Sequence, residues 1–115
     1  MGYYSTIFVI KKNSPTQCGT LAAFDLWKTH SRPSCFKTPT KYGNADILCV
    51  ENYCHLTNED ADGPLYESSL PDLIEWLEEK INGECTAPFF YEGIVAYLKV
   101  LDQKYPDLAV IHYGA

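Results

Sequence analysis

Acidic side chains crowd one stretch of this 115-residue chain, and carboxylates can steer partners, hold cations or act as acids and bases. Between positions 59 and 84, nine carboxylates stand against a single lysine, Lys80, giving a net charge of -8. Residues 1–45 carry a net charge of +5 and residues 46–115 a net charge of -11, which together make the formal charge of -6. An acidic surface steers a protein toward basic partners, and the negative total argues against direct, non-specific binding to nucleic acid.

A helix is expected at 71–81, and several of its acids stand where they cost stability. Glu75 and Glu79 are four residues apart and repel each other. Glu78 and Glu79 lie toward the negative end of the helix dipole, whereas Asp72 near the other end is favourable. A sequence optimised only for stability would mix the signs of charge. We therefore interpret the acidic stretch as a binding surface for a basic partner, with a solvated helix face as the open alternative.

Two aromatic residues could anchor such a surface, because tryptophan and tyrosine dominate binding hot spots. Tyr66 stands within the acidic stretch, and Trp76 lies at the edge of the apolar stripe of the expected helix. The predicted partner-binding residues are Glu59, Asp60, Asp62, Tyr66, Glu67, Asp72, Glu75, Trp76, Glu78 and Glu79.

One part of the acidic stretch partly matches a calcium-binding loop. Asn58, Asp60 and Asp62 alternate before Gly63, as in the first half of an EF-hand loop. The twelfth position holds Ser69 rather than a bidentate glutamate, and the preceding segment is typical of a strand rather than a helix. We therefore expect a plain acidic turn and predict no metal or cofactor.

Catalytic patterns are weaker than the acidic signal. The five cysteines form no C-x-x-C pair, and the three histidines are scattered, although a cysteine and a histidine could still meet in space. No nucleophile elbow, P-loop, dinucleotide-binding glycine pattern or H-E-x-x-H motif occurs. The carboxylates are expected on an exposed face, whereas paired catalytic acids need differently tuned surroundings. We therefore expect a binding protein rather than an enzyme.

The elements that must position these residues follow from hydrophobic periodicity. We predict strands at 3–11, 35–39, 46–56 and 108–113, a polar loop at 58–68, and helices at 15–30, 71–81 and 88–104. Gly93, inside the last helix, is interpreted as a close-packing site. The order β-α-β-β-α-α-β predicts a single α+β domain over 1–115. Its mixed, mainly antiparallel sheet would carry helices packed on one face, as a ferredoxin-like variant.

Features of the sequence that bear on location favour the cytoplasm. The first residues lack the basic leader of a signal peptide, and no apolar run approaches the length of a membrane span. The odd number of cysteines favours reduced thiols. The sequence does not predict an oligomeric state.

The opening Met1-Gly2-Tyr3-Tyr4-Ser5 followed by an expected strand resembles the start of many small bacteriophage proteins. The resemblance implies a phage accessory protein acting in the host cytoplasm. Small acidic phage proteins include inhibitors of host defence, of the anti-CRISPR or anti-restriction type, and some mimic the charge of nucleic acid. The predicted function is inhibition of a host defence protein by blocking its basic, nucleic-acid-binding site. The alternatives are an immunity or antitoxin protein that covers a nuclease toxin, and a binder of a signalling nucleotide through Lys11, Lys12 and Arg32.

Overall fold

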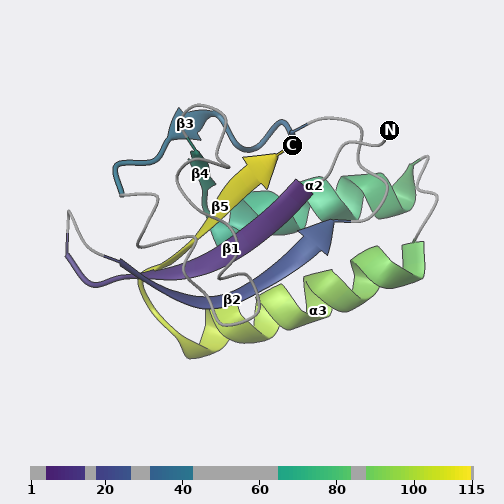
Figure 1. The fold of residues 1–115 in the computed structure, drawn as a ribbon. Coiled ribbons are helices and arrows are strands. Elements are labelled where there is room, and N and C mark those ends of the chain that lie inside the picture. The colour runs from purple at the N-terminus through teal and green to yellow at the C-terminus, as the bar shows by residue number, and fades with distance from the viewer. Residues whose placement is uncertain (1–4, 15–17, 27–31, 43–64, 84–87, 115) are drawn as a thin grey trace.

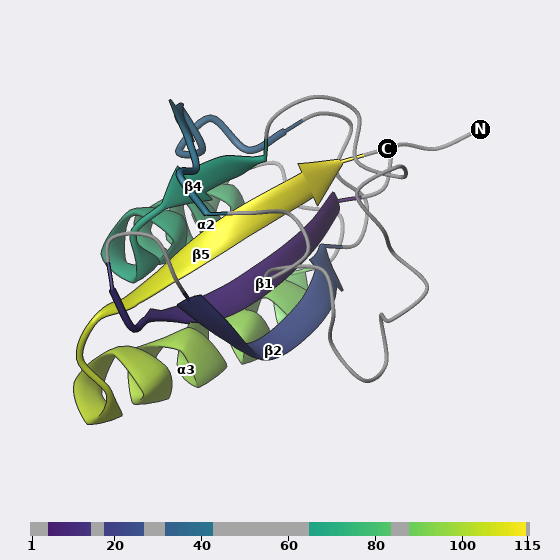
Figure 2. The same ribbon diagram turned by 60° about the vertical axis from the view of Figure 1, so that its left-hand side comes forward.

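A five-stranded antiparallel sheet with two helices on one face forms the body of the protein (Figures 1 and 2). The structure is a computed structural model, and it describes residues 5–14, 18–26, 32–42, 65–83 and 88–114. The α+β class and the packing of the helices on one face confirm the prediction. Among the described residues, no helix combines the length and the apolar character that crossing a membrane requires.

The first two strands form a hairpin, so the helix predicted at 15–30 is wrong in its described part. β1 (Ser5–Lys12) pairs antiparallel with β2 (Cys18–Leu26), and Phe8 lies opposite Ala23. The run Leu21-Ala22-Ala23 favours a helix locally, but pairing with the buried β1 outweighs that preference. Without a helix between these strands the chain departs from the ferredoxin-like pattern.

The sheet has the order β2-β1-β5-β4-β3. Every described pair of neighbouring strands is antiparallel, whereas the prediction was a mixed, mainly antiparallel sheet. β5 (Leu108–Gly114) lies beside β1 and agrees with the strand predicted there. β3 is shorter than predicted, at Thr38–Pro39. Residues Tyr66–Ser68, which were predicted to belong to a polar loop, instead form β4, because they pair with both β3 and β5. The strand predicted at 46–56 lies outside the described residues.

Both predicted helices of the acidic half are present, as α2 (Leu70–Asn82) and α3 (Pro88–Lys104). α2 begins where the Ser69 hydroxyl accepts a hydrogen bond from the Asp72 amide, at 3.2 Å, and ends at Gly83. One core cluster joins the helices to the sheet. It contains Ile7 and Val9 of β1, Val110 of β5, Leu73 and Leu77 of α2, and Ile94 and Leu98 of α3 among others.

A second apolar cluster lies on the opposite face of the sheet. Phe8 and Ile10 of β1 and Ile111 of β5 are completely buried there, together with Tyr42 and Leu65. β1 therefore buries alternate side chains on both faces, as its uninterrupted apolar run predicts.

Candidate functional site

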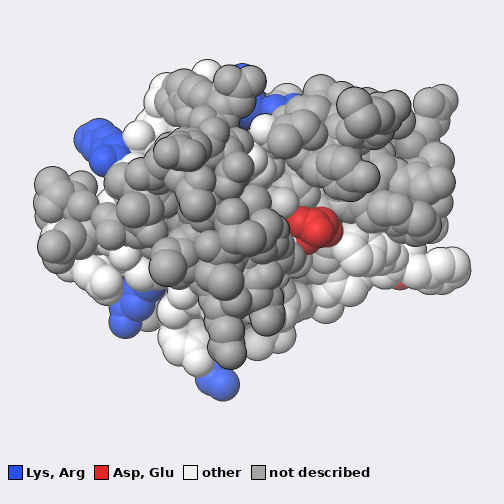
Figure 3. All heavy atoms as spheres, viewed as in Figure 1, with Lys and Arg blue, Asp and Glu red and all other residues white. Residues whose placement is uncertain are grey.

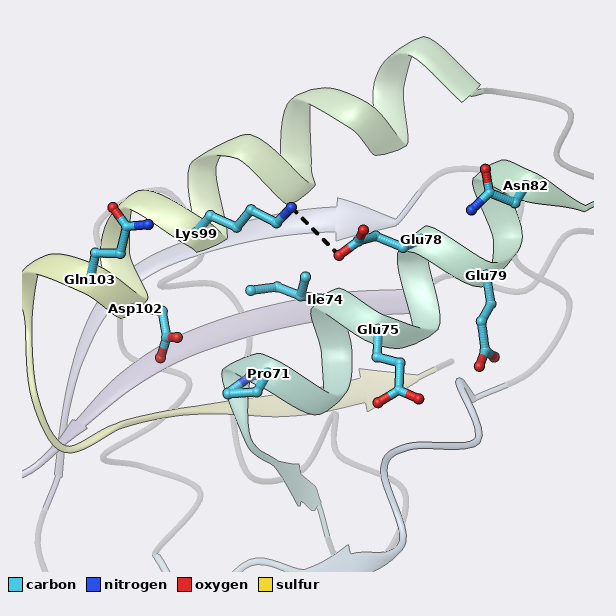
Figure 4. A pocket seen from close by; sticks show the side chains of 9 residues that line it. All are labelled: Pro71, Ile74, Glu75, Glu78, Glu79, Asn82, Lys99, Asp102 and Gln103. Carbon is cyan, nitrogen blue, oxygen red and sulfur yellow. Dashed lines mark ion pairs between the residues drawn. The ribbon is translucent and has the colours of Figure 1, made fainter.

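Most of the described carboxylates lie on α2 and α3. A hollow of about 600 Å³ between these helices, here called the acidic groove, is shown in Figure 4. Four carboxylates and one ammonium line it, a net charge of -3, beside two neutral amides and an apolar floor. Its lining residues are Pro71, Ile74, Glu75, Glu78, Glu79, Asn82, Lys99, Asp102 and Gln103. Figure 3, viewed as in Figure 1, shows few aspartate and glutamate side chains among the described residues of that face.

The carboxylates of the acidic groove differ in how they are balanced. Glu78 points toward α3, and its Oε1 atom lies 3.6 Å from the Nζ atom of Lys99 (Figure 4). Glu75 and Glu79 point away from α3 (Figure 4). Within the described part of the chain, Glu75, Glu79 and Asp102 form no ion pair. Three uncompensated charges therefore surround one half-exposed ion pair.

A second hollow, of about 270 Å³, borders the outer side of α2. It is lined by Glu75 and Glu79 again, with Asp72 and Trp76 of α2 and Ser34, Cys35 and Lys37 from the segment before β3. Glu75 and Glu79 thus form a ridge between the two hollows, one helical turn apart on an exposed face. We call these two residues the acidic ridge.

Trp76 lies beside the acidic ridge and is partly buried, as the sequence predicts for the edge of the apolar stripe. Its ring centroid lies 6.5 Å from that of Tyr91, and the Lys80 ammonium lies 5.2 Å above the ring. A cation over an aromatic face stabilises both groups. Trp76 is therefore a rim residue with a basic neighbour on its exposed face.

Tyr66 and Glu67, two predicted site residues on β4, line neither of these two hollows. The Arg32 guanidinium lies 3.6 Å from the centroid of the Tyr66 ring. Glu67 accepts a hydrogen bond from the Thr40 hydroxyl at 3.3 Å, and its other oxygen lies 2.8 Å from the Nζ atom of Lys12. The hydrogen bond to Glu67 raises the pKa of Lys12. Arg32 and Lys12, considered for a nucleotide, are thus already engaged with β4.

Several candidates lie outside the described residues, namely Glu59, Asp60 and Asp62, together with Asn58 of the partial calcium pattern and three of the five cysteines. Among the described residues, no group of three or more histidine, cysteine or acidic side chains is arranged to hold a metal ion. Of the described cysteines, Cys18 and Cys35, neither forms a disulfide bond.

A buried serine–histidine contact escaped the sequence analysis because its two members are 107 residues apart. The Nε2 atom of His112 lies 2.9 Å from the Ser5 hydroxyl, where β5 pairs with β1. Burial, with the Arg32 charge as a second cause, lowers the pKa of His112 to about 4. A serine and a histidine at this distance can act as nucleophile and base. Ser5 is 0% and His112 3% exposed, so in this conformation the contact is closed to a substrate.

The sequence analysis also missed the contribution of α3 to the acidic groove. Lys99, Asp102 and Gln103 reach it from the second half of α3. Their spacing of three and four residues places them on one side of a helix, which was a usable signal. Only the packing of α3 against α2 brings that side next to the glutamates.

Comparison with models of protein families, with curated proteins and with solved structures finds no match to this chain.

Proposed function

We propose that this chain is a binding protein that places the acidic ridge and acidic groove on a basic, nucleic-acid-binding surface of another protein. The observation that carries the proposal is the exposed, unbalanced charge of Glu75, Glu79 and Asp102 around two neighbouring hollows. Carboxylates held on a rigid helix can meet the lysines and arginines that otherwise contact phosphates.

The arrangement favours recognition over simple solvation of a helix. Glu75 and Glu79 repel each other along α2, and the hollows on either side give space for long basic side chains. Trp76 and the apolar floor of the groove at Ile74 add surface that a partner can bury. Charges of one sign mainly accelerate association and select partners, and salt weakens both effects.

The partner class follows from the resemblance of the N-terminus to phage proteins. The proposed target is a host defence protein that binds nucleic acid, as for an anti-CRISPR or anti-restriction inhibitor. The same acidic surface would serve an immunity protein that covers a nuclease toxin. The neighbouring genes distinguish these two, since a toxin gene next door favours the second.

The test captures partners from a host lysate with the full chain and measures competition on the purified partner. We expect the chain to displace a fluorescent oligonucleotide from the captured protein, with displacement weakening as salt rises. The variant Glu75→Gln/Glu79→Gln/Asp102→Asn keeps side-chain size and removes three charges. Its affinity should fall at least about tenfold, as expected for charge pairs at an interface.

Glu92→Gln is the matched control, because Glu92 is an exposed carboxylate of α3 that does not line the groove. Its affinity should stay close to that of the unmodified chain. Equal affinity of the triple variant and the control would refute the acidic surface as the binding site. A captured partner that binds no nucleic acid would refute the proposed mode of inhibition.

A further inference from the structure

α3 exposes several large apolar side chains, which is unusual for a helix on a protein surface. Phe89 is 86% and Val100 57% exposed, and Phe90 and Tyr97 are exposed by about two-fifths. Leu21 of β2 is also half exposed. It is the extra residue of a β-bulge, because Val9 pairs with Ala22 and Ile10 with Thr20. Large apolar surfaces of this kind mark interaction sites.

A hollow of about 460 Å³ lies between α3 and β2. It is lined by Ala22, Ala23, Phe24, Phe89, Phe90, Gly93, Ile94 and Tyr97, and no charged residue takes part. A Cβ atom added at Gly93 would meet nothing within 4 Å, so Gly93 is not the close-packing site that its sequence context suggested. The missing side chain instead leaves space next to exposed rings.

The two edges of the described sheet differ in how well they are protected against pairing with a strand of another chain. β3 at one edge has two residues, including Pro39, and follows Lys37. β2 at the other edge has nine residues and no proline. Its one charged residue, Asp25, accepts a hydrogen bond from the Thr6 hydroxyl at 2.8 Å. Proteins blunt exposed edges with short strands, lysine, proline and β-bulges. Apart from its bulge at Leu21, β2 carries none of these devices, so the rest of its length is suited to pairing.

We propose that a second copy of this chain docks on this face, with the β2 strands of the two copies paired antiparallel about a two-fold axis. This pairing joins the two sheets into one and brings the α3 helices together beneath it. Phe89 of each copy then faces the hollow beside Gly93 of the other. A two-fold interface requires such a self-complementary surface, with a projection and a recess on each copy.

Area and charge both favour an identical partner. The exposed apolar side chains offer on the order of 500 Å², given the usual 150–250 Å² of an aromatic side chain. With the backbone edge of β2, this approaches the roughly 800 Å² per partner of a stable interface. The lining of the hollow is uncharged, so two copies of an acidic chain can meet here without bringing carboxylates together. A basic partner is instead suited to the α2 side.

Sedimentation equilibrium of the full chain over a range of concentrations tests the proposal. We expect a concentration-dependent rise from 13.0 kDa to twice that mass. Phe89→Glu should raise the dissociation constant of the dimer at least about tenfold, as removal of a central aromatic anchor does. Leu21→Lys should have a similar effect by charging the strand edge. Melting curves of both variants show whether the fold is retained.

Lys80→Gln is the control, because Lys80 is an exposed residue of α2 that does not line this hollow, and the change should leave the dimer unchanged. A mass of 13.0 kDa at all concentrations would overturn the proposal and leave the face to a different protein. A dimer that persists in both variants would also overturn it. High salt should preserve the dimer but weaken the partner binding proposed above, so the two proposals can fail separately.

Discussion

The two helices of this protein share a core and differ on their outward sides. α2 buries Leu70, Leu73, Ile74 and Leu77 and turns carboxylates outward. α3 buries Tyr91, Ile94, Val95 and Leu98 and exposes large aromatic and aliphatic side chains beside its charged ones. Burial of the inner sides explains folding for both helices, whereas the outward sides are free to differ. The comparison indicates two surfaces, one sensitive to salt and one driven by apolar burial.

Truncating one inner leucine in each helix should have the largest effect and should be similar in both. Leu77 of α2 and Leu98 of α3 are completely buried in the same cluster. Leu77→Ala and Leu98→Ala should each lower the free energy of unfolding by about 2–5 kcal/mol, through lost burial and a residual cavity. Urea denaturation measures the loss. A negligible loss for one helix alone would contradict a shared core.

Acid should loosen the sheet beneath both helices, because His112 is buried where β5 pairs with β1. The pKa of His112 is lowered to about 4 from an ordinary value of 6.5, so the unfolded chain takes up its proton first. Stability is therefore complete above about pH 6.5 and falls by about 1.4 kcal/mol per pH unit as the pH drops toward 4.

His112→Gln removes this titration and should flatten the fall in stability between about pH 6.5 and pH 4. Denaturation at a series of pH values compares the variant with the unmodified chain. The histidine is not the cause of the fall if both lose stability equally.

Reversing one charge of the acidic ridge should give the smallest effect, and its sign distinguishes stability from binding. Glu79→Lys converts the repulsion with Glu75 into an attraction and places a cation near the C-terminal end of α2. It should raise the free energy of unfolding by roughly 0.5 kcal/mol while weakening partner binding. Thermal melting at low salt measures the gain. A loss of stability would indicate that Glu79 is kept for folding.

The helices and the first and last strands of the chain were predictable, because their signals are local. The stripe of Leu70, Leu73, Ile74 and Leu77 recurs at helical spacing, and Ser69 and Gly83 mark the two ends of α2. β1 and β5 are short, strongly apolar runs. The segment of β2 was misassigned because leucine and alanine favour a helix where no partner strand is considered. Pairing with β1 is a non-local interaction that periodicity does not encode.

The candidate site was also predictable only where its residues lie on one helix. The acids of α2 follow from their spacing along one helix, and the structure places Glu75, Glu78 and Glu79 around one groove. Glu67 and Tyr66 stand close to them in sequence but lie on β4, in contact with Lys12 and Arg32. Residues that are close in sequence can therefore lie on different surfaces when one belongs to a strand and the other to a helix.

The sequence by itself determined the net charge, the acidic block and the inner stripes of both helices, since each depends on residue type and local spacing. Only the tertiary structure decided that β2 forms an edge of the sheet, that α3 completes the acidic groove, and that Phe89 lies beside a hollow at Gly93. The physical reason is that burial and pairing join residues far apart in the chain, so exposure becomes known only once these contacts form.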